Sequence, residues 1–254
     1  MEESKRVWTD DYKVLLNNTY PDGKAKLTAY LAYFQESAWH HADNLGFGFE
    51  KIDDSGLLWV LVKLQLDINE FAAWGETVQV ETWPVGIEKI FARRDFHISN
   101  RQGKKVVSGV SWWLVLEKPA RRPASIDIVK KHIHLTTSVH AIEAKPVRIA
   151  MPEKVQKICI HHVVYSEIDI HGHVNNTCYP EWVFNALGSG WVKNHSISSF
   201  GIDFTNEAFD GEQIELFMAE GEAGECFFKG IRTSDEKEIF KMWVGLNKKA
   251  GQWD

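Results

Sequence analysis

The stretch LQLDINEFAAWGETVQVETW, residues 64–83, recurs later in the chain as FGIDFTNEAFDGEQIELFMA, residues 200–219. Asp67 matches Asp203 at a separation of 136 positions, and the Gly-Glu step in each copy keeps the same separation without a gap. Apolar and polar residues alternate around that step, as in half-buried strands joined by a turn. The sequence therefore predicts one structural pattern used twice.

A helical segment precedes each copy of the repeat. KLTAYLAYFQESAWHHADNLG, residues 26–46, has apolar residues at helical spacing and ends in a glycine that favours a helix stop. NNTCYPEWVFNALGSGW, residues 175–191, offers Asn175 or Asn176 as the N-cap. Pro180 then falls in the first turn, where proline is tolerated.

Each half also contains four strand-like segments, separated by turn signals such as NRQGKK and TSDEKE. They cover residues 59–68, 76–85, 90–99 and 104–118 in the first half, and 198–205, 212–220, 225–233 and 238–247 in the second. One long helix with four or more antiparallel strands, occurring twice, predicts an α+β fold. We expect each helix to cover one face of a strongly curved sheet.

A segment rich in proline and charge joins the halves, from residue 118 to residue 154. We expect a first domain over 1–135, a linker over 136–154 and a second domain over 155–254. The linker region contains SIDIVKKHI, residues 125–133, which predicts one short helix.

The bulk composition narrows the class of protein. The chain has 254 residues, 44% of them apolar and 25% charged, which is typical of a soluble globular protein. A net charge of −6 argues against a general nucleic-acid binder. No apolar run approaches the ~20 residues of a membrane helix, so we expect no membrane insertion. The charged start lacks a signal-peptide core, and the three cysteines are widely spaced, so a reduced, cytoplasmic protein is expected.

Polar groups are unusually dense in YSEIDIHGHVNNTCYPEW, residues 165–182. Four histidines and two acids lie within residues 161–173, but no H-E-x-x-H motif occurs, so a metal site is disfavoured. A tight turn with Gly172 at positive φ explains the glycine. That turn leaves Asp169, His171 and His173 unexplained.

Acid–base chemistry is the third interpretation of this segment. An aspartate and a histidine that face the same way form an orienting pair, and a further carboxylate can act as base on water. Glu207 stands where the first copy of the repeat has Phe71, again 136 positions earlier. This asymmetry is typical of a duplicated fold that keeps one active site.

The segment EIDIHGHVNNTCYPEWV resembles the D-x-N-x-H-x-N-N segment of acyl-ACP thioesterases, of both the plant plastid type and the shorter bacterial type. The segments WVLVKLQLDINEFAAWGETVQVETWP, ARRDF and SWWLVLEKPARRPASI are similar to the N-terminal half of that family. IDFTNEAF is similar to its late segment, which ends in an essential glutamate. The resemblance spans nearly the whole chain.

This resemblance implies a tandem hotdog fold, each half a long helix wrapped by a curved antiparallel sheet. It implies hydrolysis of the thioester between a fatty acyl chain and the phosphopantetheine arm of acyl carrier protein (ACP), without cofactor or metal. Asp169, His173 and Glu207 then fall on the catalytic positions. His171 replaces the family's asparagine, and Ala208 stands where some members carry a cysteine.

Further residues are assigned to the substrate. Asn175 and Asn176 are expected beside the thioester, at a helix start that aims backbone N–H groups at its carbonyl oxygen. The resemblance places the acyl chain in the N-terminal half, where Trp39, Trp59 and Phe34 are candidates for its lining.

The partners and rival functions are stated as expectations. ACP is acidic, so docking requires a local basic surface, to which Arg93-Arg94, Arg121-Arg122 and Lys130-Lys131 are candidate contributors. The chain is expected to be a monomer or a homodimer. Three alternatives remain open: an acyl-CoA thioesterase, a hydratase or dehydratase of acyl thioesters, and a non-catalytic acyl-thioester binder.

Overall fold

The computed structural model describes residues 5–118, 120–125, 130 and 137–247. The chain divides into two compact units, Met1–Pro146 and Val147–Asp254, which we call unit 1 and unit 2. The division falls inside the segment 136–154. Apart from positions 125 and 130, the short helix expected over 125–133 lies outside the described residues.

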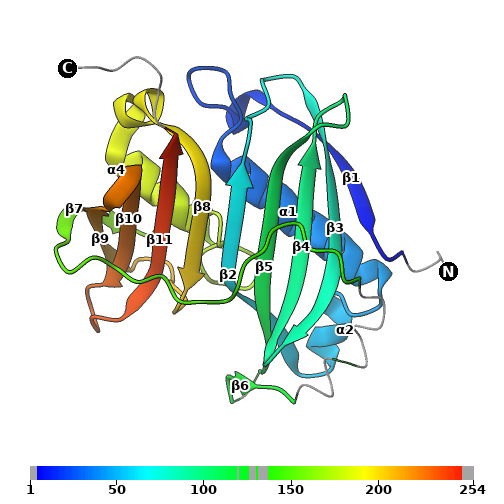
Figure 1. Cartoon of the computed structure of the whole chain (residues 1–254). Helices are drawn as coiled ribbons and strands as arrows, with labels where there is room; N and C mark the ends of the chain where they lie inside the picture. The colour runs from blue at the N-terminus through cyan, green and yellow to red at the C-terminus, as the bar shows by residue number, and fades with distance from the viewer. Residues whose placement is uncertain (1–4, 119, 126–129, 131–136, 248–254) are drawn as a thin grey trace. The chain divides into compact units, whose positions relative to one another are not determined.

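Unit 1 is an antiparallel sheet with one long helix (Figure 1). Its elements are β1 (Trp8–Lys13), η1 (Leu16–Asn18), α1 (Leu27–Asn44), α2 (Phe49–Asp54), β2 (Leu57–Ile68), β3 (Thr77–Glu88), β4 (Phe91–Ser99), β5 (Lys105–Glu117) and β6 (Arg122–Pro123). The strands are ordered β1-β3-β4-β5-β2, and β6 pairs with β5.

Unit 2 repeats this plan. Its elements are β7 (Gln156–His162), η2 (Tyr165–Glu167), α4 (Cys178–Asn194), β8 (Ser196–Phe204), β9 (Gln213–Glu220), η3 (Glu222–Gly224), β10 (Glu225–Arg232) and β11 (Glu238–Asn247). The strand order β7-β9-β10-β11-β8 matches that of unit 1 strand for strand. The predicted α+β tandem hotdog fold is therefore confirmed.

Alternation along β4 explains how the layers of unit 1 are stacked. Successive side chains of a strand point to opposite faces. Phe96 therefore faces α1, where its ring stacks on that of Phe34 at 4.4 Å between centroids. Arg93 points to the other face, which the connecting segment after residue 137 crosses. The helix α1 ends as predicted, because Gly46 adopts a φ of 80° just beyond it.

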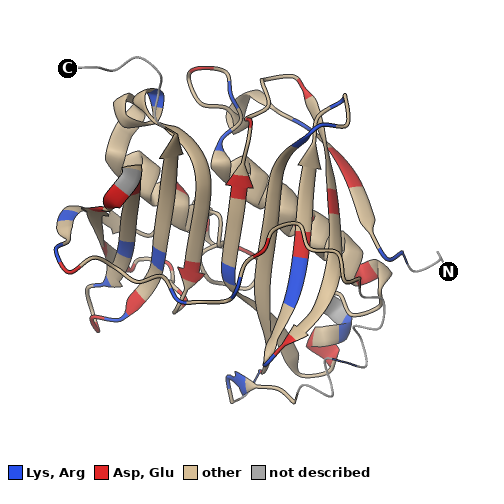
Figure 2. Ribbon diagram, viewed as in Figure 1, with Lys and Arg blue, Asp and Glu red and all other residues tan. Residues whose placement is uncertain are grey.

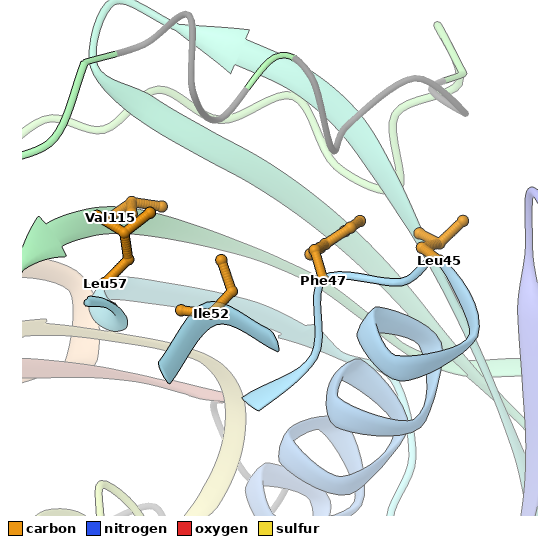
Figure 3. Close-up of a cluster of buried hydrophobic side chains, with 5 residues drawn as sticks. All are labelled: Leu45, Phe47, Ile52, Leu57 and Val115. Atoms are coloured by element: carbon orange, nitrogen blue, oxygen red, sulfur yellow. The ribbon is translucent and has the colours of Figure 1, made fainter. Parts of the chain in front are cut away.

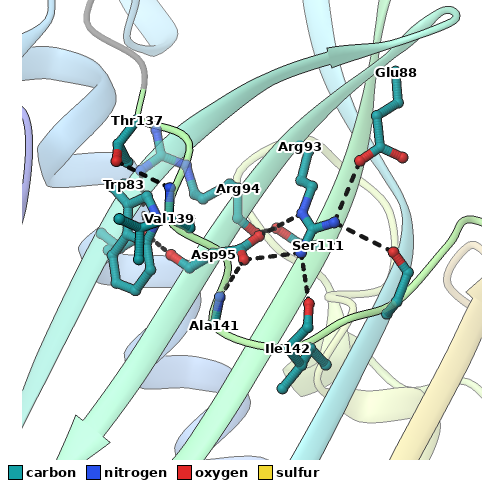
Figure 4. Close-up of polar contacts among 12 residues, drawn as sticks. Trp83, Glu88, Arg93, Arg94, Asp95, Ser111, Thr137, Val139, Ala141 and Ile142 are labelled. Carbon is teal, nitrogen blue, oxygen red and sulfur yellow. Dashed lines mark hydrogen bonds and ion pairs between the residues drawn. The ribbon is translucent and has the colours of Figure 1, made fainter.

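Buried polar contacts attach the connecting segment to the sheet of unit 1 (Figure 4). The carboxylate of Asp95 accepts two hydrogen bonds from the guanidinium of Arg93, at 2.8 and 3.0 Å, and one from the amide of Ala141 at 2.7 Å. Arg93 also donates to the carbonyl oxygens of Ile142 and Ala144. A charge pair with most of its hydrogen-bonding groups satisfied can be buried at tolerable cost.

The helix of unit 2 packs through aromatic side chains. Tyr179 and Trp182 of α4 contact Phe240 of β11, with centroid separations of 5.5 and 6.4 Å. Gly188 has φ 77° and ψ 169°, so α4 is broken at this glycine. Within the described residues, no helix is both long and apolar enough to cross a membrane.

Candidate active site

The predicted turn is a β-hairpin between η2 and α4. Ile168 and Val174 form its β-bridge, and Asp169 donates its amide to the carbonyl oxygen of His173 at 3.0 Å. Gly172 lies at φ 81° and donates to the carbonyl oxygen of Asp169, which closes the turn. A three-residue loop of this kind requires a residue in the left-handed region, where glycine carries no Cβ penalty.

This hairpin brings Asp169 and His173 to the same side. The Nδ1 atom of His173 lies 3.7 Å from the Asp169 carboxylate, and its Nε2 atom lies 3.5 Å from the Glu207 carboxylate. All three side chains are largely buried, with 19 to 28% of their surface exposed. The two distances exceed those of hydrogen bonds, and catalytic contacts commonly shorten only when the substrate is bound. One imidazole thus stands between two carboxylates.

His171 lies next to this group on the exposed side. Its ring stacks on that of His173 at 5.6 Å between centroids, and its amide donates to Asp169 Oδ1 at 2.9 Å. The four predicted catalytic residues are therefore adjacent in unit 2. Among the residues that the structure describes, no three His, Cys, Asp or Glu side chains gather as a metal-holding group.

The loop between β8 and β9 delivers Glu207 to the hairpin. The amide of Val174 donates to the carbonyl oxygen of Ala208 at 2.9 Å, so the hairpin and this loop are bonded one residue from each functional side chain. Arg232 donates to the carbonyl oxygen of Glu207 and pairs with Glu212 at 2.8 Å. These contacts fix the backbone that carries the carboxylate.

Unit 1 contains the same turn with different side chains. Tyr20 donates its amide to Lys24 at 2.8 Å, Gly23 has a φ of 80°, and Ala25 donates to the carbonyl oxygen of Ala72. Five residues of unit 1 thus make the same backbone bonds as five residues of unit 2. In matching order they are Tyr20, Gly23, Lys24, Ala25 and Ala72 in unit 1, and Asp169, Gly172, His173, Val174 and Ala208 in unit 2. Unit 1 thus has tyrosine, lysine and Phe71 where unit 2 has aspartate, histidine and glutamate.

The start of α4 differs from the prediction. The helix begins at Cys178, and its N-cap is Thr177, not Asn175 or Asn176. Asn175 instead accepts the amide of Thr177 on its Oδ1 atom at 3.0 Å, because an asparagine side chain readily closes a turn two residues ahead. Pro180 lies in the first turn, as predicted.

Cys178 lies beside this turn without the properties of a nucleophile. Burial, with the nearby charge of Glu167, raises the pKa of its thiol to about 11. The thiolate is the reactive form of cysteine, and a raised pKa keeps it scarce at neutral pH. Cys178 is therefore a poor candidate for the nucleophile, and Ala208 supplies no thiol beside Glu207.

The three aromatic residues assigned to the acyl chain lie in unit 1. Phe34 is 1% exposed and belongs to the core. Trp39 is half-buried on α1. Trp59 packs against a small apolar cluster and donates its Nε1–H to the carbonyl oxygen of Phe47 at 3.4 Å. The cluster consists of Leu45, Phe47, Ile52, Leu57 and Val115 (Figure 3).

Two basic residues proposed for docking are not surface residues. Arg93 is 3% exposed because it pairs with Asp95, and Arg94 is 7% exposed beneath α1. Arg94 donates to Nδ1 of His41 at 3.0 Å and to Thr82. The prediction that this pair contributes to a basic docking surface is wrong. Arg121, Arg122 and Lys130 are exposed, and Lys131 lies outside the described residues.

Two family models match the chain. The acyl-ACP thioesterase N-terminal domain matches residues 5–131, and the C-terminal domain of the same family matches residues 151–250. The chain belongs to the acyl-ACP thioesterase family. Within this family assignment, the hairpin and Glu207 fall in the C-terminal match, and Trp39, Trp59 and Phe34 fall in the N-terminal one.

Curated relatives support the assignment to the acyl-ACP thioesterase family. The chain is 25% identical over 252 residues to a chloroplastic acyl-[acyl-carrier-protein] hydrolase of Cuphea viscosissima, covering 92% of this chain and 61% of the relative. It is 26% identical to a chloroplastic palmitoyl-acyl carrier protein thioesterase of Cuphea hookeriana, covering 96% and 63%. The chain thus spans less than two thirds of either relative.

Solved structures share the fold. An acyl-ACP thioesterase of Bacteroides thetaiotaomicron superposes with a TM-score of 0.86 at 23% identity, over 97% of this chain and 100% of that one. A 12:0-ACP thioesterase of Umbellularia californica gives 0.84 at 20% identity, over 98% and 100%. These two comparisons show that the chain has the fold of those structures.

Proposed function

We propose that this chain hydrolyses fatty acyl-ACP, releasing a free fatty acid and ACP with a free phosphopantetheine thiol. The observation that carries the proposal is the position of His173 between the carboxylates of Asp169 and Glu207. A protein that only binds acyl thioesters gains nothing from partly buried ionisable groups, which cost free energy to desolvate. The family assignment adds the substrate class.

In this mechanism, Glu207 acts as general base. It removes a proton from a water whose oxygen bonds to the thioester carbonyl carbon, and the C–S bond then breaks as the proton passes to the leaving thiolate. His173 orients the water and the base, and Asp169 orients the imidazole through Nδ1. Direct attack by Glu207, through a transient anhydride that water hydrolyses, uses the same residues.

The start of α4 is proposed to stabilise the oxyanion. Three amides at this start already have acceptors. The amide of Asn175 donates to the carbonyl oxygen of Glu167, and the amide of Cys178 donates to the carbonyl oxygen of Asn175. The amide of Thr177 donates to the side-chain Oδ1 atom of Asn175. The amide of Asn176 is therefore our candidate donor, with His171 as a side-chain donor. The positive end of the helix dipole adds to its effect.

The acyl chain is proposed to bind in unit 1, as the family resemblance implies. Trp59 and Trp39 are better candidates for its lining than Phe34, which the core encloses. For ACP docking we retain Arg121, Arg122 and Lys130. Acidic and basic residues are otherwise interspersed over both units (Figure 2).

The test is thiol release from acyl-ACP and acyl-CoA carrying the same chain. Faster release from acyl-ACP supports the proposal. Release from acyl-CoA alone would keep the chemistry and replace the partner, and tight binding without release from either would contradict hydrolysis. A hydratase would convert an enoyl thioester without releasing thiol, which absorbance of the enoyl group detects.

A further inference from the structure

Glu167 makes three side-chain contacts just before the hairpin. Its Oε1 atom accepts the indole N–H of Trp182 at 2.7 Å, and its Oε2 atom accepts the amide of Val164 at 3.0 Å. Oε2 also lies 3.0 Å from Nε2 of His161, whose ring stacks on Trp182 at 4.3 Å. The side chain is 15% exposed. This carboxylate therefore connects β7, η2 and α4.

The backbone of Glu167 closes the open end of the hairpin. Its carbonyl oxygen accepts the amide of Asn175 at 2.9 Å, immediately outside the bridge between Ile168 and Val174. One residue thus joins both ends of the hairpin through its main chain and anchors them to α4 through its side chain. These contacts oppose rotation of the hairpin relative to α4.

Unit 1 has a weaker version of the same connection. Asn18 takes the place of Glu167: its carbonyl oxygen accepts the amide of Lys26 at 2.8 Å. Its side chain donates one hydrogen bond, at 3.2 Å, to the hydroxyl of Tyr33, which stacks on Tyr12 at 4.6 Å. The unit that holds Asp169 and His173 therefore has the charged anchor with three contacts, and the other unit has a neutral one.

We infer that Glu167 is the positioning residue of the hairpin and fixes His173 at its distances from Asp169 and Glu207. This inference rests on the proposed hydrolysis for its kinetic consequences only. Misplacing a reacting group by about 1 Å can cost about 10²-fold in rate. Glu167 itself takes no part in proton transfer.

The central variant is Glu167→Gln, which keeps the size of the side chain. The amide oxygen can still accept from Trp182, but the amide nitrogen cannot accept from Val164. We expect kcat for acyl-ACP to fall about 10- to 100-fold with KM changed less than about twofold, because the chemistry is displaced and binding is kept. Hydrogen exchange, followed by mass spectrometry, should accelerate over residues 168–175.

Asn18→Ala is the matched control. It removes the side-chain anchor of the corresponding hairpin in unit 1, so exchange should accelerate over residues 19–26 while kcat stays unchanged. His161→Phe keeps a ring stacked on Trp182, removes the contact between Nε2 and Glu167, and serves if the glutamine variant fails to fold. It should reproduce both effects of Glu167→Gln at a smaller size.

Two results would overturn the inference: an unchanged kcat in Glu167→Gln, or a reduced kcat with unchanged exchange over residues 168–175. Failure of the proposed function is distinct from both. If the unsubstituted protein cleaves no acyl thioester, the hydrolysis is wrong, and the exchange comparison still decides whether Glu167 anchors the hairpin.

Discussion

His173 and Lys24 occupy the same place in two copies of one turn, and the proposed chemistry of unit 2 rests on the difference between them. An imidazole has two ring nitrogens that can hydrogen-bond at the same time, so it can orient water between two carboxylates. In unit 1, tyrosine and phenylalanine, Tyr20 and Phe71, stand where the two carboxylates stand in unit 2. The backbone bonds of the turn are common to both units, so the assignment of chemistry to unit 2 depends on these side chains.

Cys178 gives a prediction at the scale of one atom. Because burial raises the pKa of its thiol to about 11, the Cys178→Ser variant should keep kcat for acyl-ACP within about twofold. Steady-state thiol release measures this. A loss of 10²-fold or more in a folded Cys178→Ser protein would show that the sulfur takes part in the reaction.

Two buried histidines predict the response of stability to acid. Burial, with the charge of Arg94, lowers the pKa of His41 to about 4, and burial, with Lys105, lowers that of His97 to about 4. Both stay neutral in the folded state, while their unfolded forms bind protons below about pH 6.5. The stabilisation is therefore complete above pH 6.5 and is lost as the pH falls towards 4.

The magnitude follows from the same linkage. As the pH falls from 7 to 5, protonation of each histidine in the unfolded state should lower the free energy of unfolding by roughly 2 kcal/mol. Urea unfolding at the two pH values measures the loss, and His97→Gln should reduce it by about the share of one histidine. An identical loss in His97→Gln and the unsubstituted protein would contradict the assignment.

The connecting segment sets a prediction at the scale of elements. Asp95→Ala leaves the guanidinium of Arg93 buried, with 3% of its surface exposed and without its bidentate partner. Breaking one side of a buried ion pair typically costs 3–5 kcal/mol, so we expect a loss of about 3 kcal/mol in chemical denaturation.

The matched control is Glu88→Ala. Glu88 contacts the same guanidinium at 3.3 Å but is 37% exposed. Exposed pairs contribute about 0–1 kcal/mol. Equal losses in Asp95→Ala and Glu88→Ala would mean that burial of the pair does not decide its contribution.

The elements that the sequence predicts are those with long periodic patterns. The long helices α1 and α4 and the eight strands β2–β5 and β8–β11 follow from helical spacing or alternation, whereas the short helix α2 was not predicted. The strands β1 and β7 were not predicted, because they are short, lie at sheet edges and carry charged or polar residues such as those of WTDDYK. Arg93 and Arg94 were wrongly predicted to lie on the surface. As neighbours in β4 they point to opposite faces of the sheet, and both are buried because both faces are covered.

At the scale of the whole chain, the repeat predicts the fold and part of the site. The offset of 136 positions relates Glu207 to Phe71, but the hairpins are related by an offset of 149, from Tyr20 to Asp169. Within the turn, Gly23 and Gly172 are the only identical pair at this second offset. The anchoring contacts of Glu167 could not be predicted from the sequence, because the residues that it joins lie on three separate elements.

The most direct test of the central claim is single-turnover thiol release from acyl-ACP by Glu207→Gln, beside Phe71→Leu as the matched change in unit 1. Loss of a general base should slow Glu207→Gln about 10²- to 10⁴-fold and leave Phe71→Leu within a few fold of the unsubstituted protein. Retention of full rate by a folded Glu207→Gln protein would contradict the claim that this carboxylate, with Asp169 and His173, performs the hydrolysis.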